Sequence, residues 1–580
     1  MDRQASEGGF VALRSCLGTR QMSVRARIGR WCVCLLVCAC GVVQGEATGK
    51  QAKTRVIYHD DAQSLAEAPA EGTEEFLREF LAREAAMAPV TTFCYLAATP
   101  DVCTYDTKAG EVYGDRLKEA SGWAVGIRAL RAQGTDVLKV VCSELRGRGL
   151  EVLATVRMND THHRSLDPSN PGCPQFALDH PEYVIKQPDG RTNETALDYS
   201  HEAVRAHRLA IMRELAEDYD IDGLELNFCR WAKHFPRDQG RAKAGIMTAY
   251  VGRIRQMLDE AARKRGRSAL TLGMRVPEGI EPCWLAGLDP KTWVEKGWID
   301  YLVVSTWNET DPQIRVDEFS GFTKGTKCQL LVAMGNMMGG TWRGLPKVSR
   351  RGVAQFRDSY SGMLLTAAEA RACANNYYCW GADGVSFWNI SCNMGTQGKF
   401  SSPAQRERMQ TWMHAVVNRD RVAAGARRYH YLPLYKFEEV LAPPLRNYPW
   451  YGQGRSPLGG MKMQMLRFPE NKIGERQVYR FRMADGRSGE KLQGLLRFVV
   501  FHIGADDRVA VDVNGQAVEP TKIRPAALDV KKTGLPGMRF EIALADCPPF
   551  RGDNELGITL QTKAKRKAEP TMEELDIVAE

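Results

Sequence analysis

The chain has 580 residues, more than a typical single domain, so two or more domains are expected. Hydrophobic residues make up 44% of it and charged residues 26%, which excludes wholesale disorder. A mean hydropathy of −0.36 excludes a polytopic membrane protein. The net charge of +9 includes a surplus from residues 1–45, which hold six Arg against Asp2 and Glu7. The remaining surplus is mild and has no basic cluster except Lys563–Lys567, so no nucleic-acid partner is predicted.

Residues 1–45 have the pattern of a secretory leader. Three Arg, at positions 25, 27 and 30, precede the apolar run Trp31–Val43. That run is shorter than the roughly 20 residues that a membrane-spanning helix needs. We therefore expect cleavage near residues 45–47, export to the periplasm or the extracellular space, and a mature chain without a transmembrane segment. Lipidation at Cys40, within Val37-Cys38-Ala39-Cys40, is the alternative.

The cysteines do not indicate a disulfide framework. Five of the 16 lie in the leader, and the other 11 are spread thinly over the rest of the chain.

From residue 54 onward, short β-rich runs alternate with longer helical patterns. The predicted strands are residues 55–58, 90–96, 150–157, 221–228, 269–276, 299–305, 328–334 and 384–390. The predicted helices are residues 74–87, 137–148, 201–219, 246–264, 290–296, 367–380 and 403–417. Eight β/α units over residues 54–420 predict an α/β fold, a (β/α)₈ TIM barrel. A doubly wound sheet is the alternative, but no G-x-G-x-x-G spacing follows any predicted strand.

Residues 430–565 have a different sequence pattern, in which short runs of alternating apolar and polar residues replace the helical periodicity. The predicted strands are residues 477–483, 495–503, 508–513, 539–544 and 556–561. Asn514-Gly515 between two of them predicts a hairpin, and the whole predicts an antiparallel β-sandwich. Val511–Gln516 with Arg551–Gly557 resembles the galactose-binding-like jelly-roll modules of secreted carbohydrate-active enzymes. Sugar binding and simple packing on the barrel both remain open for this domain, and residues 566–580 are expected to be a disordered tail.

Polar residues leave most of the predicted barrel strands at the end where TIM barrels carry their active sites. These exits are His59–Asp61, Arg157–His163, Asp222–Arg230, Arg275–Glu278, Trp307–Glu309 and Trp388–Asn389. On the fourth strand, period-two alternation turns Gly223, Glu225 and Asn227 toward the barrel axis. A buried acid needs a partner or a function. Glu225 is therefore either in a structural ion pair with Arg157 or Arg275, or a catalytic carboxylate.

Three of these segments carry a family resemblance. Arg157-Met-Asn-Asp160, Asp222-Gly-Leu-Glu225-Leu-Asn-Phe-Cys-Arg230 and Leu272-Gly-Met-Arg-Val-Pro277 together resemble a family of secreted bacterial glycoside hydrolases with a family-10-like barrel, many from planctomycetes. The resemblance covers roughly residues 54–420 and implies a TIM barrel that acts on carbohydrate. It does not assign the catalytic pair. Members often carry Asp where this chain has Asn227, so this strand has one carboxylate fewer than the family pattern.

Glycoside hydrolysis uses two carboxyl groups, one as proton donor and the other as nucleophile or base. The catalytic candidates are Glu225 and, as its partner, Glu309 or Asp160; Glu278 also competes. The predicted substrate-binding residues are Asp60, Arg157, Asn159, His162, Asn227, Arg230, Arg275, Trp307 and Trp388, the tryptophans as platforms for sugar rings.

No cofactor is predicted. No metal is predicted either, because the adjacent His162 and His163 would point to opposite sides of an extended chain. The sequence thus predicts an exported glycoside hydrolase that cleaves a polysaccharide or oligosaccharide. The alternative is a non-catalytic carbohydrate-binding protein that keeps the barrel cleft, and the oligomeric state is not predicted.

Overall fold

The computed structural model describes residues 54–431 and 466–580, apart from residues 164, 187–194, 237–238, 307–309, 337, 339–364, 389, 391–402 and 534. The predicted leader with Cys40 therefore lies outside the described residues, and so do Trp307 and Glu309. Within the described part, no helix has both the length and the apolar composition that crossing a bilayer requires.

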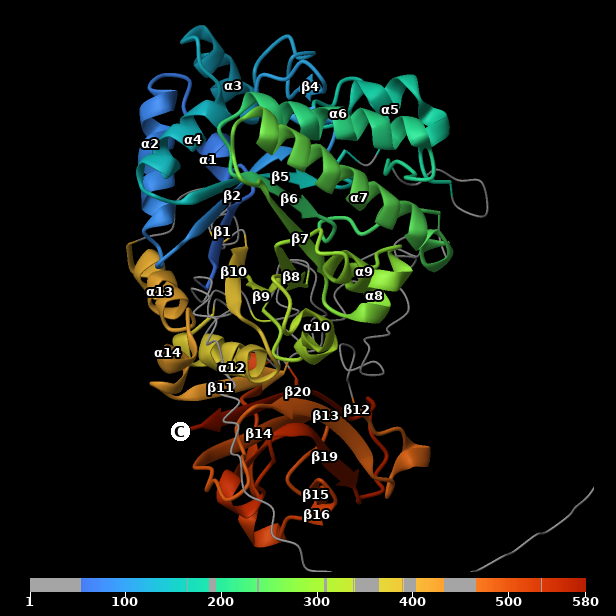
Figure 1. Cartoon of the computed structure of the whole chain (residues 1–580). Coiled ribbons are helices and arrows are strands. Elements are labelled where there is room, and N and C mark those ends of the chain that lie inside the picture. Colours follow the sequence, from blue (N-terminus) through green and yellow to red (C-terminus); the bar gives the residue numbers. More distant parts are fainter. Residues whose placement is uncertain are drawn as a thin grey trace, which may run out of the picture. The chain divides into compact units, whose positions relative to one another are not determined.

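Eight parallel strands close into a barrel (Figure 1). They are β1 (Val56–Asp60), β2 (Thr92–Ala98), β5 (Glu151–Arg157), β6 (Gly223–Asn227), β7 (Thr271–Pro277), β8 (Tyr301–Ser305), β9 (Gln329–Met334) and β10 (Gly384–Trp388). The hydrogen-bonded order is β1-β10-β9-β8-β7-β6-β5-β2, and β1 also pairs with β2, so the sheet has no free edge. The predicted TIM barrel is confirmed, and each strand overlaps its predicted range.

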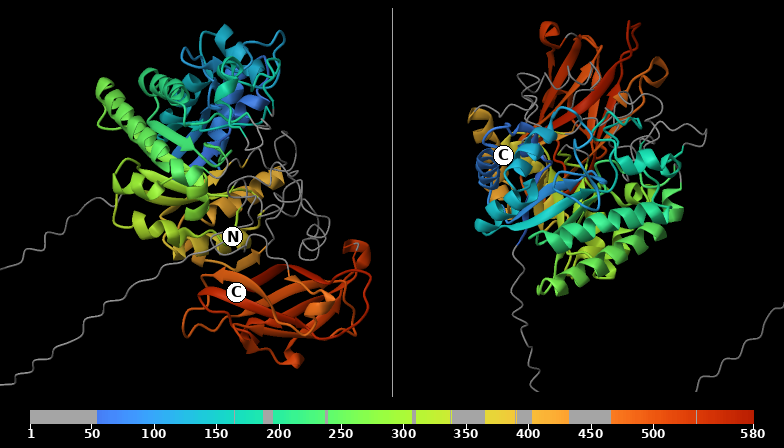
Figure 2. Two further views of the ribbon diagram at one scale, coloured as in Figure 1. Left: turned by 90° about the vertical axis from the view of Figure 1, so that its right-hand side faces the viewer. Right: turned by 90° about the horizontal axis from the view of Figure 1, so that it is seen from above.

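Helices surround the barrel. The long ones are α2 (Thr73–Ala85), α3 (Trp123–Ala132), α4 (Val137–Gly147), α6 (Glu202–Asp218), α7 (Gly240–Lys264), α12 (Ala367–Cys379) and α13 (Pro403–His414). The short ones are α1 (Gln63–Glu67), α5 (Gln175–Asp179), α8 (Ile280–Leu285), α9 (Pro290–Glu295), α10 (Val316–Thr323) and α14 (Arg419–Ala423). Helices α6 and α7 lie side by side on the outside of the barrel (Figure 2).

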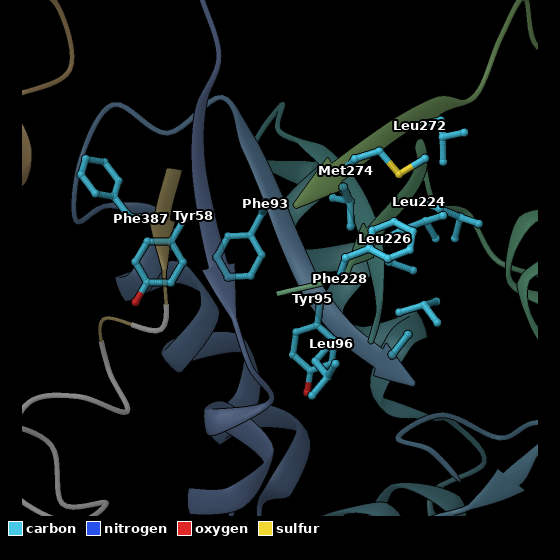
Figure 3. Packing of buried hydrophobic residues seen from close by; sticks show 14 of the residues in the cluster. Tyr58, Phe93, Tyr95, Leu96, Leu224, Leu226, Phe228, Leu272, Met274 and Phe387 are labelled. Carbon is cyan, nitrogen blue, oxygen red and sulfur yellow. The ribbon is translucent and has the colours of Figure 1, made fainter. Parts of the chain in front are cut away.

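Strand β6 shows how the sequence determines which side chains reach the barrel interior. Leu224 and Leu226 lie on its outer face, with Leu272 and Met274 of β7 beside them (Figure 3). These side chains are fully buried, and each contributes roughly 1.5–3 kcal/mol to folding. The intervening Glu225 turns inward, as the alternation predicts.

A polar cluster closes the barrel at the N-terminal ends of its strands. The Arg55 guanidinium donates to Glu151 Oε1 at 2.8 Å and Oε2 at 3.0 Å, and to Gln329 Oε1 at 2.9 Å. Thr92 and Thr271 donate their hydroxyl groups to the same Glu151 carboxylate at 2.6 and 2.7 Å. Above this cluster, apolar side chains such as Ile57 fill the axis.

The chain after β2 makes an excursion that the sequence did not predict. Strand β3 (Val102–Cys103) turns back against β2, and β4 (Glu111–Val112) pairs with β3. This excursion brings Tyr113 close to Trp123 at the start of α3, with ring centroids 5.0 Å apart.

The C-terminal region is an antiparallel β-sandwich, as predicted. Its six-stranded sheet contains β11 (Arg427–Tyr431), β12 (Leu466–Arg467), β14 (Gly494–Phe501), β17 (Arg524–Ala527), β18 (Gly537–Ala543) and β20 (Thr571–Ala579). Its four-stranded sheet contains β13 (Gln477–Met483), β15 (Val509–Val513), β16 (Gln516–Ala517) and β19 (Gly552–Leu560). A short helix, α16 (Val530–Thr533), precedes β18. Asn514 (φ 55°) and Gly515 (φ 81°) form the predicted tight turn between β15 and β16.

The prediction of a disordered tail over residues 566–580 is wrong. Strand β20 lies in the middle of the six-stranded sheet, where it pairs with β11, β12 and β14. Its charged Asp576 is fully buried, and the guanidinium groups of Arg428 and Arg497 donate to it at 2.6 and 2.8 Å. The segment is charged in composition, yet it buries the apolar side chains Met572, Leu575, Ile577 and Ala579.

Candidate active site at the barrel mouth

A pocket of about 360 Å³ opens at the C-terminal ends of β1, β5 and β6. Its lining residues are Asp61, Gln63, Ala66, Thr99, Tyr113, Gly122, Trp123, Arg157, Asp160, His162, His163, Asn170, Gly172 and Arg230. The position agrees with the general location of active sites in TIM barrels.

One guanidinium group holds two carboxylates at this pocket. Nη2 of Arg157 lies 2.5 Å from Oδ2 of Asp61, and Nη1 donates to Oδ2 of Asp160. All three side chains are only 5–6% exposed. Nη2 of Arg230 lies 4.0 Å from Asp61 Oδ2 and adds a second positive charge.

The two carboxylates are held in the ionised form. Burial alone would raise the pKa of Asp61, but the charges of Arg157 and Arg230 outweigh it and hold that pKa well below the usual range. Burial opposes ionisation of Asp160 too. His162 and Arg157 outweigh it by charge and hydrogen bonding, and they hold the pKa of Asp160 well below its usual value.

Asp160 fixes the imidazole of His162. Its Oδ1 accepts from the His162 backbone N–H at 2.8 Å and lies 2.7 Å from the ring Nδ1. The ring Nε2 lies 3.3 Å from Nη2 of Arg230, which can only donate. Neutral His162 therefore carries its proton on Nδ1 and presents Nε2 as an acceptor. Its side chain is 50% exposed, so Asp160 and His162 form an oriented pair at the pocket surface.

The two carboxylate oxygens of Asp61 differ in their contacts. Its Oδ2 faces Arg157, whereas its buried Oδ1 has no hydrogen-bond partner within the described structure. By contrast, both oxygens of Asp160 are engaged. Asp61 is therefore the pocket carboxylate with a free oxygen.

Glu225 lies inside the barrel and does not line the pocket. The Tyr301 hydroxyl donates to its Oε2 at 2.9 Å, and His59 Nε2 lies 3.3 Å from its Oε1. The side chain is 1% exposed. Burial would raise the pKa of Glu225, but His59 and Tyr301, with the charge of Arg275, lower it below its ordinary value. Its close partners are thus His59 and Tyr301, and not the direct ion pair with Arg157 or Arg275 that the sequence suggested.

Three predicted binding residues do not line the pocket, and their side chains instead form hydrogen bonds that hold nearby segments of the chain. Asp60 accepts from the Gln63 N–H at 2.7 Å and from the Ser64 hydroxyl at 2.6 Å. Asn159 Nδ2 donates to the Leu197 carbonyl at 3.1 Å. The third residue, Asn227, acts in the turn after β6.

Asn227 Oδ1 accepts from the backbone N–H groups of Cys229 at 3.0 Å and Arg230 at 3.1 Å. This Asn227 contact holds Arg230 where it borders the pocket. The side-chain amide of Asn227 therefore stabilises the turn after β6.

Trp388 and Arg275 form a buried stack. The guanidinium carbon of Arg275 lies 3.4 Å from the centroid of the Trp388 ring, and the His59 ring centroid lies 4.0 Å from it. Trp388 is only 1% exposed, so it offers no open face for a sugar ring and the predicted platform is not present here. Of the predicted site residues, the structure brings Arg157, Asp160, His162 and Arg230 together around the pocket.

The pocket residues that the sequence analysis did not assign to the site include Asp61, Tyr113, Trp123 and His163. The period-two argument used for Glu225 would have selected Asp61 over Asp60, because inward His59 is two residues before it. Tyr113 and Trp123 lie at the excursion after β2, which has no periodic signal.

His162 and His163 both line the pocket, contrary to the expectation that they diverge. The reason is that they lie in a turn and not in an extended segment. Among the residues that the structure describes, no three His, Cys, Asp or Glu side chains are grouped as metal ligands.

No protein-family model matches the chain, and the comparison with curated proteins gives no match. Among solved structures, α-L-fucosidase isoenzyme 2 from Paenibacillus thiaminolyticus is 12% identical with a TM-score of 0.39, covering 65% of this chain and 51% of its own. The present chain thus spans about half the length of that fucosidase.

Two further solved structures are similar. A class V chitinase from Pseudomonas fluorescens Pf-5 is 13% identical (TM-score 0.34), and the PgaB glycoside hydrolase domain from Bordetella bronchiseptica is 10% identical (TM-score 0.36). Each match covers 62% of this chain and 99% of the other. Likenesses of this size say nothing about substrate or reaction. The resemblance to a planctomycete-type, family-10-like group stays a prediction.

Proposed function

We propose that the chain is a glycoside hydrolase that cleaves glycosidic bonds at the pocket lined by Asp61, Asp160 and His162. The observation that carries this proposal is the ionised Asp61, with one unpartnered oxygen, beside a histidine that Asp160 orients. Export of the chain and a polysaccharide or oligosaccharide substrate belong to the same proposal.

The chemistry needs one group to protonate the leaving oxygen and another to supply or activate the incoming nucleophile. In this proposal, the Asp61 carboxylate acts on the anomeric carbon, directly or through a water molecule. His162, protonated on Nε2 in place of its contact with Arg230, gives that proton to the leaving oxygen as the glycosidic C–O bond breaks. Water supplies the hydroxyl group of the new sugar end and the proton that restores His162.

His162 takes the donor role because Asp160 is unsuited to it. A general acid must hold a proton near the working pH. The Asp160 carboxylate is held ionised, and both of its oxygens already have partners. Asp160 is therefore a positioning residue for His162, which differs from the two-carboxylate mechanism that the sequence predicted.

Two aromatic side chains give the pocket a surface for a sugar ring. Tyr113 and Trp123 are only partly buried and contribute to its lining. Aromatic faces offer a large contact area at low conformational cost. They replace Trp388 as candidate stacking groups.

A non-catalytic carbohydrate-binding protein is the second candidate. The observation that favours it is that neither described carboxylate of this pocket is held protonated, so a carboxylic acid donor is not in place. An accessory role of the sandwich in sugar binding is part of either proposal.

The deciding experiment is a screen of the full chain on a polysaccharide panel and on 4-nitrophenyl glycosides, with release of reducing sugar or nitrophenol as the readout. Asp61→Asn should lower hydrolysis about 10²–10⁴-fold. Asp167→Asn, at an exposed carboxylate outside the pocket, is the matched control and should match the unmodified protein. A folded Asp61→Asn variant with the original rate would refute the assignment, and binding without hydrolysis would favour the second candidate.

A further inference from the structure

His163 is a buried pocket residue whose ring has no hydrogen-bond partner. It is 5% exposed, it lines the pocket, and neither Nδ1 nor Nε2 is hydrogen-bonded within the described structure. Burying such polar atoms without partners is unfavourable, so they usually have a ligand or a role. Burial also lowers the pKa of His163, which keeps its ring neutral.

Two other unpartnered buried atoms belong to the same lining. Asp61 Oδ1 is an acceptor, and Arg157 Nε is a donor. A neutral imidazole adds one donor and one acceptor. Apart from Asp61 Oδ1, which acts on the anomeric carbon in the proposed function, these lining residues hold two donors and one acceptor without hydrogen-bond partners, beside the Tyr113 and Trp123 rings. A pair of sugar hydroxyl groups, each able to donate and to accept, satisfies such a set.

We infer that His163, together with Arg157 Nε, binds the hydroxyl groups of an uncharged sugar unit in this pocket. The inference rests on the proposed function for the chemical class of the ligand. It adds His163 as a residue that determines specificity. It also predicts that the bound sugar is uncharged, which neither the family resemblance nor the reaction chemistry implies.

The prediction of an uncharged sugar follows from the ion pairs that the charged side chains of the pocket already form. Arg157 is matched by Asp61 and Asp160, and Arg230 lies beside Asp61 and His162. A uronate or sulfated sugar would bring a further negative charge against the ionised Asp61 and the neutral His163. Such a group would lose its hydration without gaining a dedicated cation, which is costly in a buried site.

The test uses ligand-observed NMR with the full chain at pH 7. The probes are the methyl glycosides of glucose, galactose, mannose and xylose, and methyl glucuronide as the charged probe. At least one neutral glycoside should bind, and methyl glucuronide should bind at least tenfold more weakly than that glycoside. His163→Phe should weaken the neutral glycoside about tenfold or more. His163→Gln should restore part of the affinity, because an amide also donates and accepts.

A matched variant separates binding from folding. His234 is another buried histidine, hydrogen-bonded at 3.1 Å to the Ala286 carbonyl, and it does not line the pocket. His234→Gln should leave the affinity of the neutral glycoside unchanged. If only the stability changed in the His163 variants, their affinity per folded molecule would equal that of the unmodified protein, and the inference would be overturned.

The outcomes distinguish this inference from the proposed function. Binding of a neutral glycoside that depends on His163, without hydrolysis on any substrate, supports the inference and refutes the glycosidase proposal. Hydrolysis that is unaffected by His163→Phe supports the glycosidase proposal and refutes the inference. Preferential binding of methyl glucuronide, or no binding of any neutral glycoside, also refutes it.

Discussion

Nη2 of Arg157 lies 2.5 Å from Oδ2 of Asp61, while Nη1 of the same guanidinium donates to Asp160. The arginine at the end of β5 therefore connects the carboxylate that follows β1 with the one that orients His162. Both carboxylates therefore depend on the same buried guanidinium, which shows how the loops after separate strands are held together at the barrel mouth.

Replacing Arg157 with Met should destabilise the protein by about 3–5 kcal/mol at pH 7, because two buried carboxylates would lose their common partner. The pKa values of Asp61 and Asp160 should rise in the variant, so its deficit should shrink as the pH falls toward 4. Urea unfolding monitored at several pH values measures both effects. A deficit that does not change with pH would mean that lost packing, and not charge, is responsible.

Asp160→Asn should reduce kcat about 10²-fold or more while KM changes little, because Asp160 acts through His162 and does not contact substrate. The measurement needs the substrate identified in the activity screen. The double variant with His162→Ala should be no slower than His162→Ala alone, since the two residues act as one unit. Additive losses would contradict the positioning role.

Glu225→Gln should lower the free energy of unfolding by roughly 1–3 kcal/mol at pH 7, because the amide places a donor NH₂ group either beside His59 Nε2 or where Oε2 accepts from Tyr301. Activity per folded molecule should stay within a few-fold. A folded but inactive variant would show that Glu225 is needed for catalysis.

The Glu225→Gln variant should also change how the stability of the protein depends on pH. The pKa of Glu225 is below its ordinary value, so its ionised form stabilises the fold at pH values above about 4.3, and this contribution is lost as the pH falls through the lowered pKa. The stability of Glu225→Gln should therefore depend less on pH on the acid side than that of the unmodified chain. Thermal unfolding midpoints between pH 7 and pH 3 measure this difference.

Asp311→Asn should stabilise the protein at pH 7.5 by about 2–3 kcal/mol. Burial raises the pKa of Asp311 to about 6, and its Oδ2 has no hydrogen-bond partner among the residues that the structure describes. Asn keeps an acceptor for the Gln313 N–H at 2.9 Å and carries no charge to bury. Because the pKa is raised, the cost of ionising the buried Asp311 is fully present above about pH 6 and is lost as the pH falls toward 4. The stability advantage of Asp311→Asn should therefore disappear toward pH 4. Asp167→Asn, on the surface, should show no such gain.

Much of the barrel was predictable because its strands are short apolar runs between helices with a clear period. The inward orientation of Glu225 followed from alternation on one strand. The pocket was harder to predict, since it is made by turns and excursions without a period, as at Tyr113 and His163. Strand β20 was missed because Asp576 looks like a solvent-exposed residue until its partners Arg428 and Arg497 are known.

The position of β20 has a consequence for how the sandwich is assembled during synthesis. Most barrel strands pair with the barrel strand that precedes them in the chain, so the barrel can grow in step with translation until β10 closes on β1. In the six-stranded sheet, β11 and β14 come earlier in the chain, but both are bridged by β20, which follows every other strand of the sandwich. Their open edges must wait for it, and during that interval they are exposed to pairing with other nascent chains.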